Sequence, residues 1–144
     1  MTDIYASCVR WMEKGLLICG GSGSGKSDLC LRLLDNGAEL VADDRTIVEN
    51  RDGKLYASCP DPLKGLMEVR GIGIIETPFI PETEINLKLD LRTKEKIDRM
   101  PIEETEIVEG VELPVFATDA FEVSAVLKIK TFLQILSAQR RRIS

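Results

Sequence analysis

The stretch GGSGSGKS, from Gly20 to Ser27, decides what fold this 144-residue sequence is expected to adopt. It fits the phosphate-binding pattern G-x-x-x-x-G-K-[ST], in which glycines let consecutive backbone N–H groups turn toward phosphate oxygens. A helix that follows such a loop adds its free N-terminal N–H groups and the positive end of its dipole. The pattern predicts a nucleotide phosphate site formed by Gly20, Gly21, Ser22, Gly23, Ser24, Gly25, Lys26 and Ser27.

The sequence on both sides of this stretch supports the prediction. The apolar run from Gly15 to Cys19 is typical of a buried strand. After the loop, Leu29, Leu33 and Leu34 have helical spacing, and Gly37 is a stop signal. A flexible Gly/Ser linker that matches the pattern by chance is the alternative, but such linkers rarely lie between a buried strand and an amphipathic helix.

Composition limits the function classes. Hydrophobic residues make up 44% and charged residues 30%, which indicates one globular domain over residues 1–144. A net charge of -5 argues against nucleic acid or an anionic membrane as the main partner. The chain has 4 cysteines and no histidine, so we expect no zinc site and a cytoplasmic protein with reduced thiols. Cys8, Cys19 and Cys30 lie in apolar runs and are expected in the core.

The remaining patterns predict a mixed sheet with a few helices. Strands are expected at residues 3–11, 16–19, 40–42 and 84–92, and around Gly110. Residues 46–59 have the pattern of a hairpin that turns at Asp52-Gly53. Besides the helix after the loop, helices are expected over Thr93–Met100 and from about Asp119 to Arg140. Asp119 is expected to cap the last helix, with Glu122 completing a capping box. The predicted fold class is α/β, with a mixed sheet around the phosphate loop.

The last helix is also expected to carry an apolar stripe that packs in the core rather than binding a cofactor. The members of this stripe are Phe121, Val126, Ile129, Phe132, Leu133 and Leu136.

Two carboxylates follow the strand that comes after the predicted helix. Asp43 and Asp44 end the apolar run Leu40–Ala42. Carboxylates beside a phosphate loop hold Mg²⁺ or position a nucleophile, although Asp pairs also occur in plain turns. If the strand continued to Asp44, alternation would point the two side chains to opposite faces, and only one would face the phosphates. A second charged pair, Glu68 and Arg70, lies in the apolar stretch Leu63–Glu76 and fits either a site or an exposed ion pair.

Three motifs together resemble the catalytic domain of bacterial HPr kinase/phosphorylase. They are GGSGSGKSDLCLRLLDNGAELVADD (20–44), MEVRGIGIIE (67–76) and IDRMP (97–101), and the resemblance covers most of the chain. It implies ATP-dependent phosphorylation of a seryl hydroxyl on an HPr-like phosphocarrier protein, and a reverse reaction that uses inorganic phosphate.

By position, the resemblance implies catalytic roles for Lys26, Asp44 and Arg99. Lys26 would contact the phosphates, Asp44 would be the general base and Arg99 would belong to the catalytic set. Ser27 and Glu68 would hold Mg²⁺. The resemblance also makes a homo-oligomer, a hexamer in the family, plausible.

The chain departs from the family pattern in two places. Tyr5 stands where the family commonly carries a histidine, and a tyrosine has no positive charge near neutral pH. The stretch VFATDAFEVS, residues 115–124, replaces a loop that carries an arginine in the long enzymes. These differences predict that phosphorylation exceeds reverse phosphorolysis. The sequence leaves open an NTPase or small-molecule kinase, and a nucleotide-binding regulatory module without kinase activity.

Overall fold

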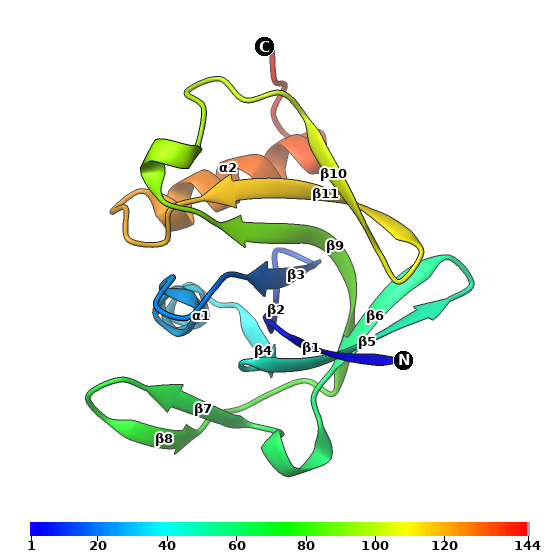
Figure 1. Ribbon diagram of the computed structural model, residues 1–144, viewed down its shortest axis with the longest axis vertical. Coiled ribbons are helices and arrows are strands. Elements are labelled where there is room, and N and C mark those ends of the chain that lie inside the picture. The colour runs from blue at the N-terminus through cyan, green and yellow to red at the C-terminus, as the bar shows by residue number, and fades with distance from the viewer. Residues whose placement is uncertain (144) are drawn as a thin grey trace.

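The computed structural model describes residues 1–143, which form a strongly curled mixed sheet with two helices against it (Figure 1). The α-helices are α1 (Lys26–Asp35) and α2 (Ala125–Leu136). Short 3-10 turns are η1 (Asp61–Leu63) and η2 (Lys94–Lys96). The strands are β1 (Thr2–Tyr5), β2 (Ser7–Trp11), β3 (Lys14–Cys19), β4 (Glu39–Ala42), β5 (Arg45–Arg51), β6 (Lys54–Ser58), β7 (Leu66–Val69), β8 (Gly73–Glu76), β9 (Glu82–Leu91), β10 (Glu104–Val108) and β11 (Val111–Thr118).

Strand β9 joins the two halves of the sheet. It pairs in parallel with β3 and with β11, and its first residues pair antiparallel with β6. Within residues 1–143 the main sheet is 9-stranded, with the order β1-β5-β6-β9-β3-β2-β4, and β11 and β10 branch from β9. Because β6 and β11 use different stretches of β9, the sheet bends sharply there. The predicted α/β class with a mixed sheet is therefore confirmed.

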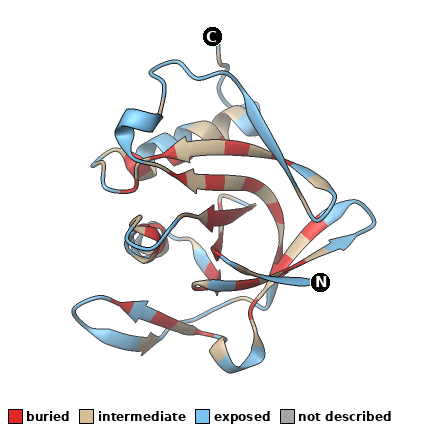
Figure 2. Cartoon of the chain, in the orientation of Figure 1, coloured by how far each residue is buried: buried red, intermediate tan, exposed pale blue. Residues whose placement is uncertain are grey.

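The curled sheet buries side chains on both faces. Leu16 and Ile18 of β3 pack with Leu29 and Leu33 of α1, in a cluster that also includes residues of α2. Leu17, between them, points to the opposite face and packs in a second cluster with residues of β4, β5 and β6. In Figure 2 the buried positions accordingly concentrate on the central strands. A strand buried on both faces is continuously apolar, which explains the run that precedes the glycine-rich loop.

Several local predictions are confirmed. The turn between β5 and β6 has positive φ at Asp52 (53°) and Gly53 (85°), as a two-residue hairpin of this type requires. The predicted strand at 84–92 corresponds to β9, and two strands flank Gly110. Cys8 and Cys30 are fully buried, whereas Cys19 is only partly buried.

Two predictions of local structure are wrong in extent. The expected strand at 3–11 is interrupted between Tyr5 and Ser7, because β1 pairs with β5 while β2 pairs with β3 and β4. The expected helix at Thr93–Met100 is only the turn η2, and Thr93 makes no side-chain cap. The stretch Leu63–Glu76, for which no element is predicted, contains a separate hairpin, β7–β8.

The last helix is also shorter than predicted, since α2 begins at Ala125 rather than near Asp119. Asp119 Oδ1 instead accepts a hydrogen bond from Phe121 N (3.0 Å), which makes a local turn. Glu122 forms an ion pair with Lys128 (2.9 Å) and completes no capping box. Ile129 and Leu133 are buried as expected, but Phe121 lies before the helix and is largely exposed.

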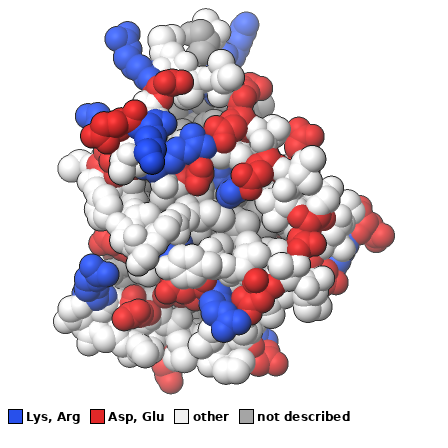
Figure 3. All heavy atoms as spheres, in the orientation of Figure 1, with Lys and Arg blue, Asp and Glu red and all other residues white. Residues whose placement is uncertain are grey.

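The surface carries charges of both signs. On the face shown in Figure 3, basic and acidic side chains are interspersed around the rim, and uncharged side chains fill much of the middle. Neither helix in the described range 1–143 has the length and apolar character needed to cross a membrane.

Candidate active site

The glycine-rich loop, residues 20–25, connects the end of β3 to the start of α1, as the sequence predicts. Gly23 and Gly25 have φ values of 80° and 89°, which side chains rarely allow. Ser24 N donates a hydrogen bond to Gly21 O (3.1 Å), which turns the loop back on itself. A Cβ at Gly20 would lie 2.4 Å from Ser24 Oγ and 3.0 Å from Leu91 Cβ, so a larger residue there would force Ser24 to move.

The loop leaves polar groups without protein partners. Gly25 is the N-cap residue of α1, and no side chain caps this helix end. Ser24 Oγ is buried and has no hydrogen-bond partner within residues 1–143. A Cβ at Gly21 or Gly23 would meet no atom within 4 Å, so the space beside these residues is open. Free N–H groups at a helix N-terminus next to open space suit an anion.

Lys26 forms the centre of the site. It is only 5% exposed, and its Nζ lies 3.0 Å from Asp44 Oδ1. The same ammonium lies over the ring of Tyr5, 4.0 Å from the ring centroid. Burial lowers the pKa of Lys26, but Tyr5 and Asp44 together more than offset this effect, so that the pKa is raised. Lys26 therefore carries a full positive charge at neutral pH.

Asp43 joins three parts of the site through its buried carboxylate. Ser7 Oγ donates to Asp43 Oδ1 (3.1 Å), and Glu68 N donates to Asp43 Oδ2 (3.2 Å). Ser27 Oγ lies at 3.5 Å from Oδ1, a long contact. Burial, and then the negative charge of Asp44, raise the pKa of Asp43.

The strand before Asp43 and Asp44 does not continue to Asp44, so strand alternation does not set the directions of the two side chains. β4 ends at Ala42, and Asp44 has a left-handed backbone with φ of 64°. Strand alternation does not apply beyond Ala42. The two carboxylates instead contact consecutive residues at the start of α1. Asp44 contacts Lys26, and Asp43 contacts Ser27.

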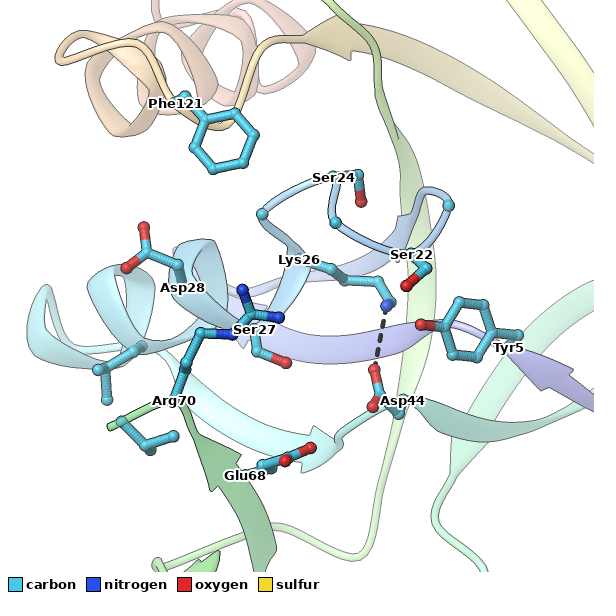
Figure 4. A pocket seen from close by; sticks show the side chains of 15 residues that line it. Tyr5, Ser22, Ser24, Lys26, Ser27, Asp28, Asp44, Glu68, Arg70 and Phe121 are labelled. Carbon is cyan, nitrogen blue, oxygen red and sulfur yellow. Dashed lines mark ion pairs between the residues drawn. The ribbon is translucent and has the colours of Figure 1, made fainter. Parts of the chain in front are cut away.

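Lys26, Asp44 and the glycine-rich loop line a pocket of about 630 Å³. Figure 4 shows Tyr5 beside the Lys26–Asp44 pair and Phe121 at the opposite end, while Glu68 and Arg70 extend into the pocket from the end of β7. The lining residues are Tyr5, Gly21, Ser22, Gly23, Ser24, Gly25, Lys26, Ser27, Asp28, Leu31, Asp44, Glu68, Val69, Arg70 and Phe121.

Most residues predicted from the sequence meet in this pocket, but Arg99 does not. Arg99 is exposed and lines two grooves beside β11 and α2. Its catalytic role stays a prediction. The lining also includes Arg70, for which the sequence left a site or an exposed ion pair open, and Phe121, for which it predicts no site role. Arg70 was visible as a charge inside an apolar stretch, whereas nothing in the sequence marked Phe121, which was assigned to a helix face.

The carboxylates of the site would bind Mg²⁺ only together with the phosphates of a bound ligand. Within residues 1–143, no group of three His, Cys, Asp or Glu side chains is arranged to hold a metal ion. Mg²⁺ commonly takes one or two carboxylates and completes its shell with water and substrate phosphates. The oxygen donors Ser27 and Glu68, with Asp43 next to Ser27, fit that kind of site.

Comparisons with known proteins agree with the geometry. A family model described as the HPr Serine kinase C-terminal domain matches residues 1–120. The HPr kinase/phosphorylase of Clostridium tetani is 43% identical over 92 residues, which cover 64% of this chain and 30% of that protein. The enzyme of the same name from Lactobacillus delbrueckii subsp. bulgaricus is 37% identical over 122 residues, covering 76% of this chain and 39% of that protein.

A solved structure extends the match to the fold. The structure of the Hpr(Ser) kinase/phosphatase from Coxiella burnetii superimposes with a TM-score of 0.85 at 26% sequence identity, covering 97% of this chain and 100% of that one. The matches to the curated relatives above span only 30% and 39% of their length. Because the family model matches residues 1–120, the chain belongs to the HPr serine kinase C-terminal domain family.

Proposed function

We propose that this protein transfers the γ-phosphoryl group of ATP to a seryl hydroxyl of an HPr-like phosphocarrier protein. The observation that carries this proposal is the Lys26–Asp44 ion pair (3.0 Å), which lies in the pocket at the glycine-rich loop. Phosphoryl transfer needs positioned charge more than covalent help. The pair supplies a cation for the phosphates and a carboxylate next to it.

The loop and Lys26 are proposed to bind the triphosphate. The open space beside Gly21 and Gly23 and the uncapped start of α1 offer backbone N–H groups to phosphate oxygens. Lys26 is already oriented by Tyr5 and Asp44 before any ligand binds. Little side-chain ordering is then left to oppose binding.

Asp44 is proposed as the general base. A seryl O–H that enters the pocket gives its proton to the Asp44 carboxylate while its oxygen bonds to the γ-phosphorus, and ADP leaves. In the free protein the carboxylate is paired with Lys26. The negative triphosphate competes for the same ammonium, which frees Asp44 to accept the proton. Asp43, held by Ser7 and the Glu68 backbone, is a positioning residue for Ser27.

Magnesium, when bound, neutralises charge on the phosphates. Ser27 and Glu68 are the residues proposed to hold it, because hard cations prefer oxygen donors. Glu68 lines the pocket and keeps its carboxylate free of ion pairs within residues 1–143. The role proposed for Arg99 rests on the family resemblance alone.

The whole-protein properties are proposals of the same kind. Residues 1–144 are proposed to act as one kinase domain in the cytoplasm, with an HPr-like protein as partner and neither nucleic acid nor membrane required. The family resemblance favours a homo-oligomer.

The direct test is to incubate the protein with γ-labelled ATP, Mg²⁺ and a panel of phosphocarrier proteins. We expect label on one serine of a carrier, and loss of labelling when that serine is replaced by alanine. ATP hydrolysis without label on any carrier would indicate an NTPase instead. Nucleotide binding with neither hydrolysis nor transfer would indicate a regulatory module.

We further propose that phosphorylation exceeds the phosphate-dependent reverse reaction. Tyr5 lies against Lys26 and lines the pocket, and by the family resemblance it stands where a histidine is common. A neutral ring there adds no positive charge for inorganic phosphate. The reverse rate of Tyr5→His should therefore exceed that of the wild type, and should rise as the pH is lowered and the histidine gains charge. Comparable forward and reverse rates in the wild type at physiological phosphate concentration would contradict this proposal.

A further inference from the structure

Phe121 is a large apolar side chain that is left exposed at the mouth of the pocket. It is 68% exposed and lies at the end of the pocket opposite the Lys26–Asp44 pair (Figure 4). Its ring contacts the glycine-rich loop, because a Cβ at Gly25 would lie 3.1 Å from Phe121 Cζ. An exposed aromatic ring that lines a polar pocket is a candidate contact for a planar ligand group.

The peptide group that precedes the ring, between Ala120 and Phe121, is anchored at both its carbonyl and its N–H. Ala120 is 1% exposed, and its carbonyl oxygen accepts a hydrogen bond from the guanidinium of Arg32 on α1. Phe121 N donates to Asp119 Oδ1 (3.0 Å). The segment is thus attached to the helix that begins the phosphate site. A ring held in this way presents its face to a ligand at a small entropic cost.

The direction of a bound nucleotide follows from the loop. In this type of loop the lysine reaches the β- and γ-phosphates, so the γ-phosphate belongs near Lys26 and Asp44. The rest of the nucleotide must then extend toward the other end of the pocket. That end is formed by Phe121 and by Leu31, which lies one helical turn beyond Ser27 and is 37% exposed.

We propose that Phe121 and Leu31 form the binding surface for the nucleobase of the nucleoside triphosphate. This inference rests on the proposed function, since it assumes a triphosphate at the glycine-rich loop. Every base has a π-face, so stacking on Phe121 accepts different bases. The nearby carboxylate of Asp28 is already bound to Arg32 (3.0 Å), which leaves the ring as the main contact.

The test compares ATP with inorganic tripolyphosphate, which carries the phosphates without a base. Binding of both, with Mg²⁺, is measured by calorimetry for the wild type and for Phe121→Ala. We expect Phe121→Ala to weaken ATP binding by about 5- to 150-fold, the range typical of a lost base stack, and to leave tripolyphosphate binding unchanged. Phe121→Trp should restore ATP binding. Leu31→Ala, on the rigid helix, should weaken ATP binding alone by a smaller factor.

Val123→Ala is the matched control, because Val123 is 101% exposed and lies two residues away, outside the pocket lining. It should change neither affinity. Equal weakening of ATP and tripolyphosphate binding in Phe121→Ala would show that the ring only supports the loop. Unchanged ATP binding would show that the ring makes no contact with the base. Either result overturns the inference and leaves the proposed function standing. A wild-type protein that binds neither ligand would overturn the proposed function, and this inference with it.

Discussion

Two hollows of similar size on this molecule have very different walls. The pocket at the glycine-rich loop has a volume of about 630 Å³, and the groove between η2 and α2 has about 690 Å³. The pocket contains the Lys26–Asp44 pair and an uncapped helix start. The groove is lined largely by apolar side chains, among them Phe132 and Ile135, and Arg99 lies on its rim. The comparison shows that volume does not identify a site; convergent polar groups with unmet bonding capacity do.

The largest expected effect is at the cation of the pocket. Lys26→Ala should abolish measurable ATP binding with Mg²⁺, and with it turnover, because the phosphates lose their buried positive charge. Thermal shift and calorimetry with ATP–Mg²⁺ check this. Lys130→Ala, which removes an exposed lysine of α2, is the control and should bind like the wild type. Retained ATP binding in Lys26→Ala would contradict the assignment of the pocket at the glycine-rich loop as the phosphate site.

The next largest effect is expected at Asp44. Asp44→Asn should lower turnover by about 10²–10⁴, because it removes a positioned base, and it should keep ATP affinity or improve it. It should also lower the stability of the free protein, since Lys26 loses its carboxylate. That loss should stay below the about 3–5 kcal/mol of a fully buried pair because Asp44 is 38% exposed.

The matched variant is Asp43→Asn, which should cost less turnover because Asp43 acts through Ser27. Single-turnover phosphoryl transfer and ATP titrations of both variants decide the matter. An inactive Asp43→Asn beside a near-normal Asp44→Asn would reverse the assignment.

A smaller effect is expected at the two arginines, one from each hollow. Both Arg70 and Arg99 are exposed, but only Arg70 lines the pocket. Arg70→Ala should lower turnover by roughly 10- to 100-fold, as for a lost hydrogen bond to a charged group. If the active site is formed by a single chain, Arg99→Ala should lower turnover less than Arg70→Ala does. The comparison of kcat and KM for both variants tests this, and a larger loss in Arg99→Ala would favour the family-based role and a site completed by another copy.

The smallest effect concerns stability and pH. The pKa of Asp43 is raised from 3.8 by burial and by Asp44, so the folded protein holds this proton to higher pH than the unfolded chain does. The contribution of the protonated carboxyl is fully present below pH 3.8 and is lost as pH rises through the folded-state pKa. Because asparagine does not titrate, Asp43→Asn should remove the decline in stability that occurs between pH 3.8 and the folded-state pKa. Urea unfolding at several pH values checks this, with the exposed Asp98→Asn as control.

The contrast between Asp43 and Arg99 shows where prediction from sequence stops. The loop, its flanking strand and helix, and the carboxylates after β4 are local patterns, and the structure brings them together as expected. Which side Asp43 and Asp44 face was not predictable, because the left-handed turn at Asp44 replaces strand alternation. Arg99 lies in a segment where the expected helix is a single turn, so its position depends on neighbouring elements.

The sequence by itself determined the glycine-rich loop, the buried strand before it, the hairpin at Asp52-Gly53 and the family. These features depend on residue types at short spacings, where local backbone preference and hydrophobic periodicity dominate. Only the tertiary structure decided that Tyr5 lies against Lys26, that Asp43 joins Ser7 to Ser27, and that Phe121 covers Gly25. Each of these contacts joins residues far apart in the chain through strand pairing, such as β1 with β5 and β2 with β4, and through the packing of α1, and such long-range burial leaves no local pattern.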